Sequence, residues 1–177
     1  MLSRGGSGNA DVELVEHDGE SYVVKDFAGR GPVFRWIAPW LVRRELRAYA
    51  QLAGHPNVPQ VVARVDALAF VLEYRPGQVL GPALASWVPD SFIANLRAAV
   101  AEMHARGVVH LDLRHRSNAL ADPVGKPVLI DFASAICFRP RGLGARFVLP
   151  LLAWIDVRAI AKWERQLARA RPPGAGT

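Results

Sequence analysis

The chain has 177 residues, of which 51% are hydrophobic, and a formal net charge of +6. This length suffices for one compact core or for two small lobes packed together. The longest nearly continuous apolar run, 147–155, is far shorter than the roughly 20 residues of a membrane span, and the glycine-rich start is unlike a secretory signal. The single cysteine, Cys137, excludes an internal disulfide and fits a reducing cytosol.

The first part of the chain is predicted to be rich in strands. A hairpin is expected over 10–27, because two runs of β-branched and aromatic residues flank a turn signal at 17–20. The further elements expected before the linker at 75–77 are a helix over 33–53 and strands over 61–65 and 68–74.

The second part is predicted to be rich in helices. One helix is expected from an N-cap at Asp90 to a stop at Gly107. Two short strands at 119–120 and 128–130 and a last helix over 151–169 follow it. The order favours an α+β protein of two lobes. We expect lobes over 1–75 and 76–171 and a disordered tail over 172–177.

Glu45 stands out on the first predicted helix. Its neighbours three and four positions away are all apolar or aromatic: Leu41, Val42, Ala48 and Tyr49. If this face is buried, the carboxylate needs a cation from another element, since an unpaired buried charge costs several kcal/mol. If the face is only partly buried, Glu45 can extend to water instead. The helix alone does not separate these two interpretations.

Lys25 is the obvious partner, because it follows an apolar run and is one of only three lysines beside 19 arginines. A compact ammonium can reach a carboxylate and a phosphate together, which suits lysine better than arginine. An exposed strand lysine is the simpler alternative. Upstream, Gly5 and Gly8 would let the backbone approach phosphate oxygens, although a short glycine-rich terminus is also typical of a loose chain end.

The strongest signal is the segment 110–120, in which Asp112 and Asn118 lie between two short apolar stretches. Asp131 follows thirteen residues after Asn118, directly behind a third apolar stretch. One carboxylate can accept a proton from a substrate hydroxyl, and the other, with the amide oxygen, can hold Mg²⁺. These residue types suit phosphoryl transfer, which depends on positioning and on neutralising phosphate charge.

With these motifs in order over residues 3–137, the chain resembles the protein-kinase-like superfamily, and most closely the small atypical bacterial kinases of the RIO-like and lipopolysaccharide-core (Kdo/heptose) groups. The resemblance implies an ATP- and Mg²⁺-dependent kinase in which Lys25 and Glu45 form the strand–helix pair. It implies that Asp112 acts on the acceptor hydroxyl and that Asn118 and Asp131 bind the metal. It also implies that Gly5 and Gly8 cover the phosphates and that Glu73 and Tyr74 meet the adenine.

The chain departs from the family pattern in four places. Asn118 lies six residues after Asp112, where the usual spacing is five, so the loop carries an insertion. Leu111 replaces the usual arginine, and Ala133 replaces the glycine that follows Asp-Phe. Only 46 residues follow Asp131, which leaves no room for the usual helical substrate platform.

The acceptor is therefore open. A protein Ser/Thr hydroxyl is the first choice, a lipopolysaccharide or lipid-linked sugar at the membrane surface is an alternative, and a nucleotide-binding pseudokinase is another. Aromatic residues beside arginines, at 34–44 and 139–155, fit either packing against the shortened second lobe or peripheral contact with the inner membrane. The arginines are otherwise scattered, so no nucleic-acid partner is expected. We expect a cytoplasmic location.

Overall fold

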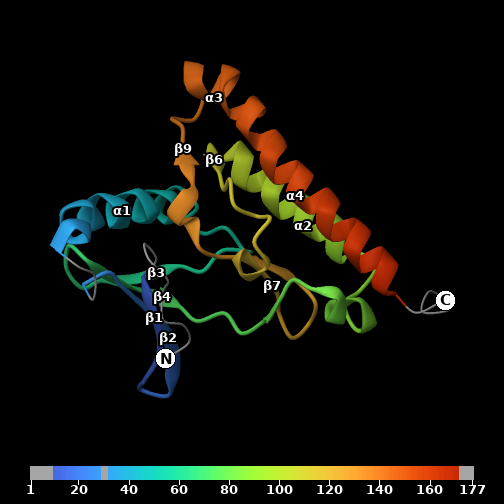
Figure 1. Cartoon of the computed structure of the whole chain (residues 1–177), viewed down its shortest axis with the longest axis horizontal. Helices are drawn as coiled ribbons and strands as arrows, with labels where there is room; N and C mark the ends of the chain where they lie inside the picture. Colours follow the sequence, from blue (N-terminus) through green and yellow to red (C-terminus); the bar gives the residue numbers. More distant parts are fainter. Residues whose placement is uncertain (1–9, 29–31, 172–177) are drawn as a thin grey trace.

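The computed structural model describes residues 10–28 and 32–171, which combine helix and sheet. An antiparallel sheet with the order β1–β2–β4–β3 comes first. Its strands are β1 (Asp11–His17), β2 (Glu20–Asp26), β3 (Val61–Arg64) and β4 (Ala69–Glu73). Helix α1 (Pro32–Gln51) lies alongside this sheet and leads toward the second half of the chain (Figure 1).

The predicted hairpin is confirmed by the β1–β2 pair. His17 pairs with Glu20 across a two-residue turn. Asp18 and Gly19 both have positive φ, 52° and 80°, as the type I′ turn preferred in two-residue hairpins requires. The turn fixes the register, and the register places Lys25 opposite Val12 and Phe70 in the middle of the sheet.

The second half contains two long helices, α2 (Phe92–Ala105) and α4 (Leu149–Ala170), which pack side by side (Figure 1). Short strands connect them to the rest. One small sheet joins β5 (Gln78–Val79), β7 (Ala119–Ala121) and β8 (Pro127–Leu129), and β6 (Val108–Val109) pairs with β9 (Ile136–Cys137). The remaining pieces are helix α3 (Leu143–Phe147) and the 3₁₀ turns η1 (Pro82–Ser86), η2 (Arg116–Asn118) and η3 (Phe132–Ser134).

A single cluster of buried apolar side chains extends through both halves. It includes Phe70 of the sheet, Met103 of α2, Leu129 of β8 and Trp163 of α4. The strand-rich first part and helix-rich second part agree with the sequence analysis. The division into two lobes near residue 75 stays a prediction.

Two local predictions were wrong. Helix α2 has its N-cap at Ser91 rather than Asp90, and the Asp90 carboxylate forms an ion pair with Arg171 at the end of α4. The last helix begins two residues earlier than expected. A separate short helix, α3, precedes it, and the sequence analysis did not predict this helix. Among the described residues, no helix is both long and apolar enough to cross a membrane.

The aromatic clusters beside the arginines do not form core, where described. Trp36, Ile37 and Trp40 on α1 are exposed. So are the aromatic residues Phe147 and Trp154 of the run 147–155, although its Leu149 and Ala153 pack in a small core cluster. Phe34 lies where side chains are not described. The interpretation as packing against the second half is therefore wrong for these residues, and membrane contact stays open.

Candidate active site

Lys25 of β2 and Glu45 of α1 form a buried ion pair. Lys25 Nζ donates to Glu45 Oε1 at 2.6 Å, and Glu45 has no exposed surface. The interpretation in which Glu45 extends to water is therefore wrong. Burial raises the pKa of Glu45 and outweighs the opposing charge of Lys25. Burial also disfavours the lysine cation, but the charges of Glu45 and Asp131 raise the pKa of Lys25 above its usual range.

Asp131 shares the same ammonium group. Lys25 Nζ donates to Asp131 Oδ1 at 2.9 Å, so one lysine bridges two carboxylates that lie 86 residues apart in the chain. Burial raises the pKa of Asp131, but the charge of Lys25 and its hydrogen bond outweigh burial and lower this pKa. Asp131 has a φ of 63°, a costly conformation for a non-glycine residue that is typical of functional sites.

Asp112 and Asn118 contact each other despite the unusual spacing. Asn118 Nδ2 donates to Asp112 Oδ2 at 2.8 Å and to its backbone carbonyl at 3.0 Å. This orientation leaves the Asn118 amide oxygen on the other side, where it accepts from Ser117 Oγ at 3.2 Å. The backbone N–H of Ile130 donates to the Asn118 carbonyl at 3.0 Å. Asn118 is thus held beside the strand that leads into Asp131.

A cavity of about 720 Å³ lies against these residues, within the range of small-ligand sites. Lys25, Glu45, Asn118 and Asp131 line its polar part. Glu73 and Tyr74 line it further along, together with apolar side chains from both halves of the chain, among them Val12, Val23, Leu72, Val79 and Leu120. Such a slot suits a flat ring joined to a charged group.

Two groups of predicted residues are not part of the cavity as described. Asp112 does not line it, although its carboxylate is one hydrogen bond away through Asn118. Gly5 and Gly8 lie outside the described residues. The remaining site residues come together from β2, α1, the end of β4, η2 and the segment after β8.

Asp156 is a buried carboxylate beside the site that the sequence analysis missed. It is completely buried on α4. Its carboxylate accepts hydrogen bonds from the backbone N–H groups of His110 at 2.9 Å and Leu111 at 2.8 Å. His104 Nε2 also contacts it at 2.9 Å. Leu111 has a φ of 69°, and Asp156 holds this strained backbone directly before Asp112.

The signal for Asp156 was in the sequence. Its neighbours three and four positions away are all apolar: Leu152, Ala153, Ala159 and Ile160. The same pattern had singled out Glu45, and it indicates a buried carboxylate with partners on another element.

A column of rings supports the loop from the other side. Phe132 packs edge-on to Tyr49 of α1, with centroids 5.1 Å apart, and its centroid lies 4.8 Å from that of His110. The His110 ring contacts the Ile130 carbonyl through Nε2 at 3.0 Å, so Nε2 carries the proton. Burial lowers the pKa of His110. The column joins α1 to the loop that bears Asp112.

The residues present fit Mg²⁺ held together with a ligand rather than a dedicated metal cage. Within 10–28 and 32–171, no three His, Cys, Asp or Glu side chains converge on one point. Mg²⁺ commonly takes one or two protein oxygens and completes its shell with phosphate and water. The Asp131 carboxylate is partly exposed, and together with the Asn118 amide oxygen it offers such a hard-oxygen pair.

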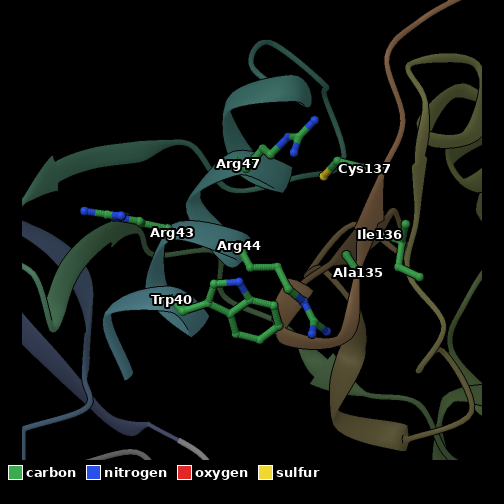
Figure 2. A pocket seen from close by; sticks show the side chains of 7 residues that line it. All are labelled: Trp40, Arg43, Arg44, Arg47, Ala135, Ile136 and Cys137. Atoms are coloured by element: carbon green, nitrogen blue, oxygen red, sulfur yellow. The ribbon is translucent and has the colours of Figure 1, made fainter. Parts of the chain in front are cut away.

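A second cavity, of about 420 Å³, lies between α1 and β9 (Figure 2). Trp40, Arg43, Arg44 and Arg47 line it from the helix, and Ala135–Cys137 line it from the other side. The three guanidinium groups point in different directions (Figure 2), so they do not form a single anion site. Arg44 also lines the larger cavity.

Comparison with known proteins gives a partial match to a protein kinase. The chain is 33% identical, over 144 residues, to the CBL-interacting protein kinase 25 of Oryza sativa subsp. japonica. The match covers 72% of this chain and 27% of the kinase, so the chain spans about a quarter of the length of this relative. No protein-family model matches the chain. The chain is thus similar to a protein kinase over most of its length.

Proposed function

We propose that the chain is a kinase that transfers the γ-phosphoryl group of ATP to a hydroxyl, with Mg²⁺ as the required metal. The bridge from Lys25 to Glu45 and Asp131 carries this proposal. It places a cation at the wall of a cavity with an apolar slot on one side and oxygen donors on the other. The partial similarity to a protein kinase supports it independently.

Each side chain then has a distinct task. Glu45 fixes the ammonium of Lys25, which contacts the α- and β-phosphates. Asp131 and the Asn118 amide oxygen would hold Mg²⁺, which neutralises phosphate charge when bound. Asp112 accepts the proton of the acceptor hydroxyl and is oriented by the Asn118 amide. Glu73 and Tyr74 lie along the slot for the adenine.

A protein Ser/Thr hydroxyl is the proposed acceptor, because the relative's name describes a protein kinase. The finer resemblance to RIO-like and lipopolysaccharide-core kinases rests on the sequence motifs alone, and with it the alternative of a lipid-linked sugar acceptor. We place the protein in the cytoplasm, with peripheral contact at the inner membrane as the alternative location.

Radiolabelled ATP turnover in the presence of Mg²⁺ tests the proposal. We expect turnover to fall by about a hundredfold or more in Asp112→Ala and Asp131→Ala, because general-base and charge-stabilising groups each contribute on this scale. Glu16→Gln changes an exposed carboxylate on β1 and should leave turnover unchanged. Undiminished turnover in either aspartate variant would contradict the assignment.

One observation favours a second candidate, a nucleotide-binding pseudokinase. Asp112 does not line the cavity. ATP could therefore bind there without a carboxylate in reach to accept the proton of a substrate hydroxyl. Calorimetric titration with Mg-ATP separates the two. Binding without turnover on any protein or sugar acceptor supports the pseudokinase, whereas turnover that depends on Asp112 excludes it.

A further inference from the structure

Large apolar side chains are exposed along α3 and the first half of α4. We call this surface the α3–α4 ridge. Its members are between 43% and 77% exposed, and they are Leu143, Phe147, Val148, Leu151, Trp154 and Val157. Helix α3 lies at one extreme of the molecule, where α4 begins (Figure 1). The ridge is therefore a projecting surface rather than a groove.

The ridge is not the core-facing side of α4. That side carries Leu149, Ala153, Asp156 and Ala159, all of them buried. The first turns of α4 are thus apolar both toward the protein and away from it. A contiguous exposed apolar surface of this kind is rare on soluble monomers and marks an interaction site.

The exposed charges on the segment that forms the ridge have a single sign. Arg141, Arg146 and Arg158 are exposed there. Between residues 132 and 163 the sequence holds one acidic residue, Asp156, and its carboxylate is buried on the opposite side. A partner for this surface must therefore be apolar at its centre and negatively charged at its rim.

Two arginines lie against the aromatic rings of the ridge. The Arg158 guanidinium carbon is 4.4 Å from the ring centre of Trp154, and that of Arg146 is 5.5 Å from the ring centre of Phe147. Arginine can keep its charge at the level of lipid headgroups while its stem and the neighbouring ring lie deeper. Tryptophan is enriched at this same level of the bilayer.

We propose that the α3–α4 ridge docks the protein on the surface of a membrane that contains anionic lipid. A projecting apolar surface with a basic rim matches an interfacial membrane contact, in which apolar burial and attraction to anionic headgroups add together. A symmetric dimer through the ridge is disfavoured, because it would place the same arginines against each other. This inference does not depend on kinase activity.

Co-sedimentation of the full chain with lipid vesicles tests the proposal. We expect binding to vesicles with about one third anionic phospholipid, and at least roughly tenfold weaker binding to neutral phosphatidylcholine vesicles, since each basic residue near the surface adds attraction. Raising the salt from about 0.1 M to 0.5 M should weaken binding further, because it screens these charges. Equal binding to both kinds of vesicle, or none, would overturn the proposal.

Matched variants locate the contact. The double variant Phe147→Ser/Leu151→Ser should bind anionic vesicles at least about tenfold more weakly than the unmodified chain, because it removes two exposed apolar anchors. Val124→Ser alters an equally exposed residue in the β7–β8 turn and should bind as the unmodified chain does. Asp131→Asn should also bind normally, which separates docking from catalysis. Self-association that the double variant abolishes, with no vesicle binding, would instead assign the ridge to a second copy of the chain.

Discussion

Helices α1 and α4 each bury one carboxylate in the middle of an apolar face, but the two carboxylates have different kinds of partner. Glu45 of α1 is paired with a side-chain cation, Lys25, which also reaches Asp131. Asp156 of α4 binds mainly backbone N–H groups of the loop before Asp112. One helix therefore fixes a charge at the cavity, and the other fixes the shape of a loop.

The difference shows how a short chain can support one site from two sides. A side-chain partner can exchange, so Lys25 is free to contact a ligand phosphate while Glu45 still holds it. Backbone partners cannot exchange without unfolding the loop. We therefore expect changes at Asp156 to affect folding most, and changes near Lys25 to divide between stability and activity.

The largest expected effect comes from Asp156→Ala. The variant leaves two backbone N–H groups without an acceptor, the buried one of His110 and the part-buried one of Leu111, and a buried group of this kind costs about 1–3 kcal/mol. We expect the free energy of unfolding to fall by about 3–5 kcal/mol, measured by urea denaturation followed by circular dichroism.

Two variants serve as controls for that measurement. Asp156→Asn keeps one acceptor oxygen and should lose less stability than Asp156→Ala. Glu164→Gln changes a half-exposed ion pair on the same helix and should cost no more than about 1 kcal/mol. A loss in Asp156→Ala as small as that of Glu164→Gln would contradict the anchoring role.

Lys25→Met should have the next largest effect on stability. It leaves Glu45 buried without its cation, and breaking a buried pair costs about 3–5 kcal/mol. Because the pKa of Glu45 is already raised by burial, the carboxyl can take up a proton, so we expect a net loss of about 2–4 kcal/mol at neutral pH that shrinks in acid.

A double variant isolates the charge from the packing. Lys25→Met/Glu45→Leu replaces the pair with apolar side chains of similar size and should recover most of the lost stability. It should still show no ATP turnover. If the double variant is no more stable than Lys25→Met, the pair contributes through packing rather than through its charge.

Much of this arrangement could be predicted from local sequence. The hairpin, the helix that carries Glu45 and the β7–β8 pair follow from periodicity and turn residues. The apolar neighbours of Glu45 predicted a distant cation, and Lys25 is that cation. The same pattern surrounds Asp156, so the sequence also carried a signal for this second buried carboxylate.

Other features depended on long-range contacts. The Asp90 carboxylate, which the sequence analysis assigned to the N-cap of α2, forms an ion pair with Arg171, 81 residues further along the chain. The exposure of the α3–α4 ridge could not be inferred either, since an apolar run reads alike whether or not another element covers it. The contact between Asn118, at the end of η2, and Asp112 also could not be inferred from the spacing of the two residues in the sequence.

Asp131→Asn should separate stability from activity. The Asp131 side chain is 40% exposed, so its ion pair with Lys25 is screened by water and its loss should cost about 1 kcal/mol or less. ATP turnover should nevertheless be lost, because the amide is a poorer metal ligand. Measuring both in one preparation checks this, and a stability loss comparable to that of Asp156→Ala would contradict the division between the two helices.

The smallest expected effect concerns pH. Burial lowers the pKa of His110 although Asp156, Asp131 and Asp112 face it. The unfolded chain therefore binds a proton that the folded chain does not, and stability should fall by about 1 kcal/mol as the pH drops below roughly 6.5. Urea denaturation at two pH values checks this. His110→Gln should reduce the difference, and an unchanged difference would assign it to another group, such as His55, whose pKa burial also lowers.

The stability contributed by the Lys25–Glu45 pair depends on pH with the opposite sign. The pKa of Lys25 is raised in the folded chain, so its contribution is complete below the usual lysine pKa of about 10.4 and is lost only at higher pH. Loss of stability in strong alkali should therefore involve the pair on α1. In acid, Asp131 contributes as well, because Lys25 outweighs the effect of burial and lowers its pKa, and this stabilisation is lost as the pH falls through that pKa. Lys25→Met/Glu45→Leu should flatten the alkaline limb, and an alkaline limb as steep as that of the unmodified chain would assign it to another group, such as Tyr49, whose pKa burial raises.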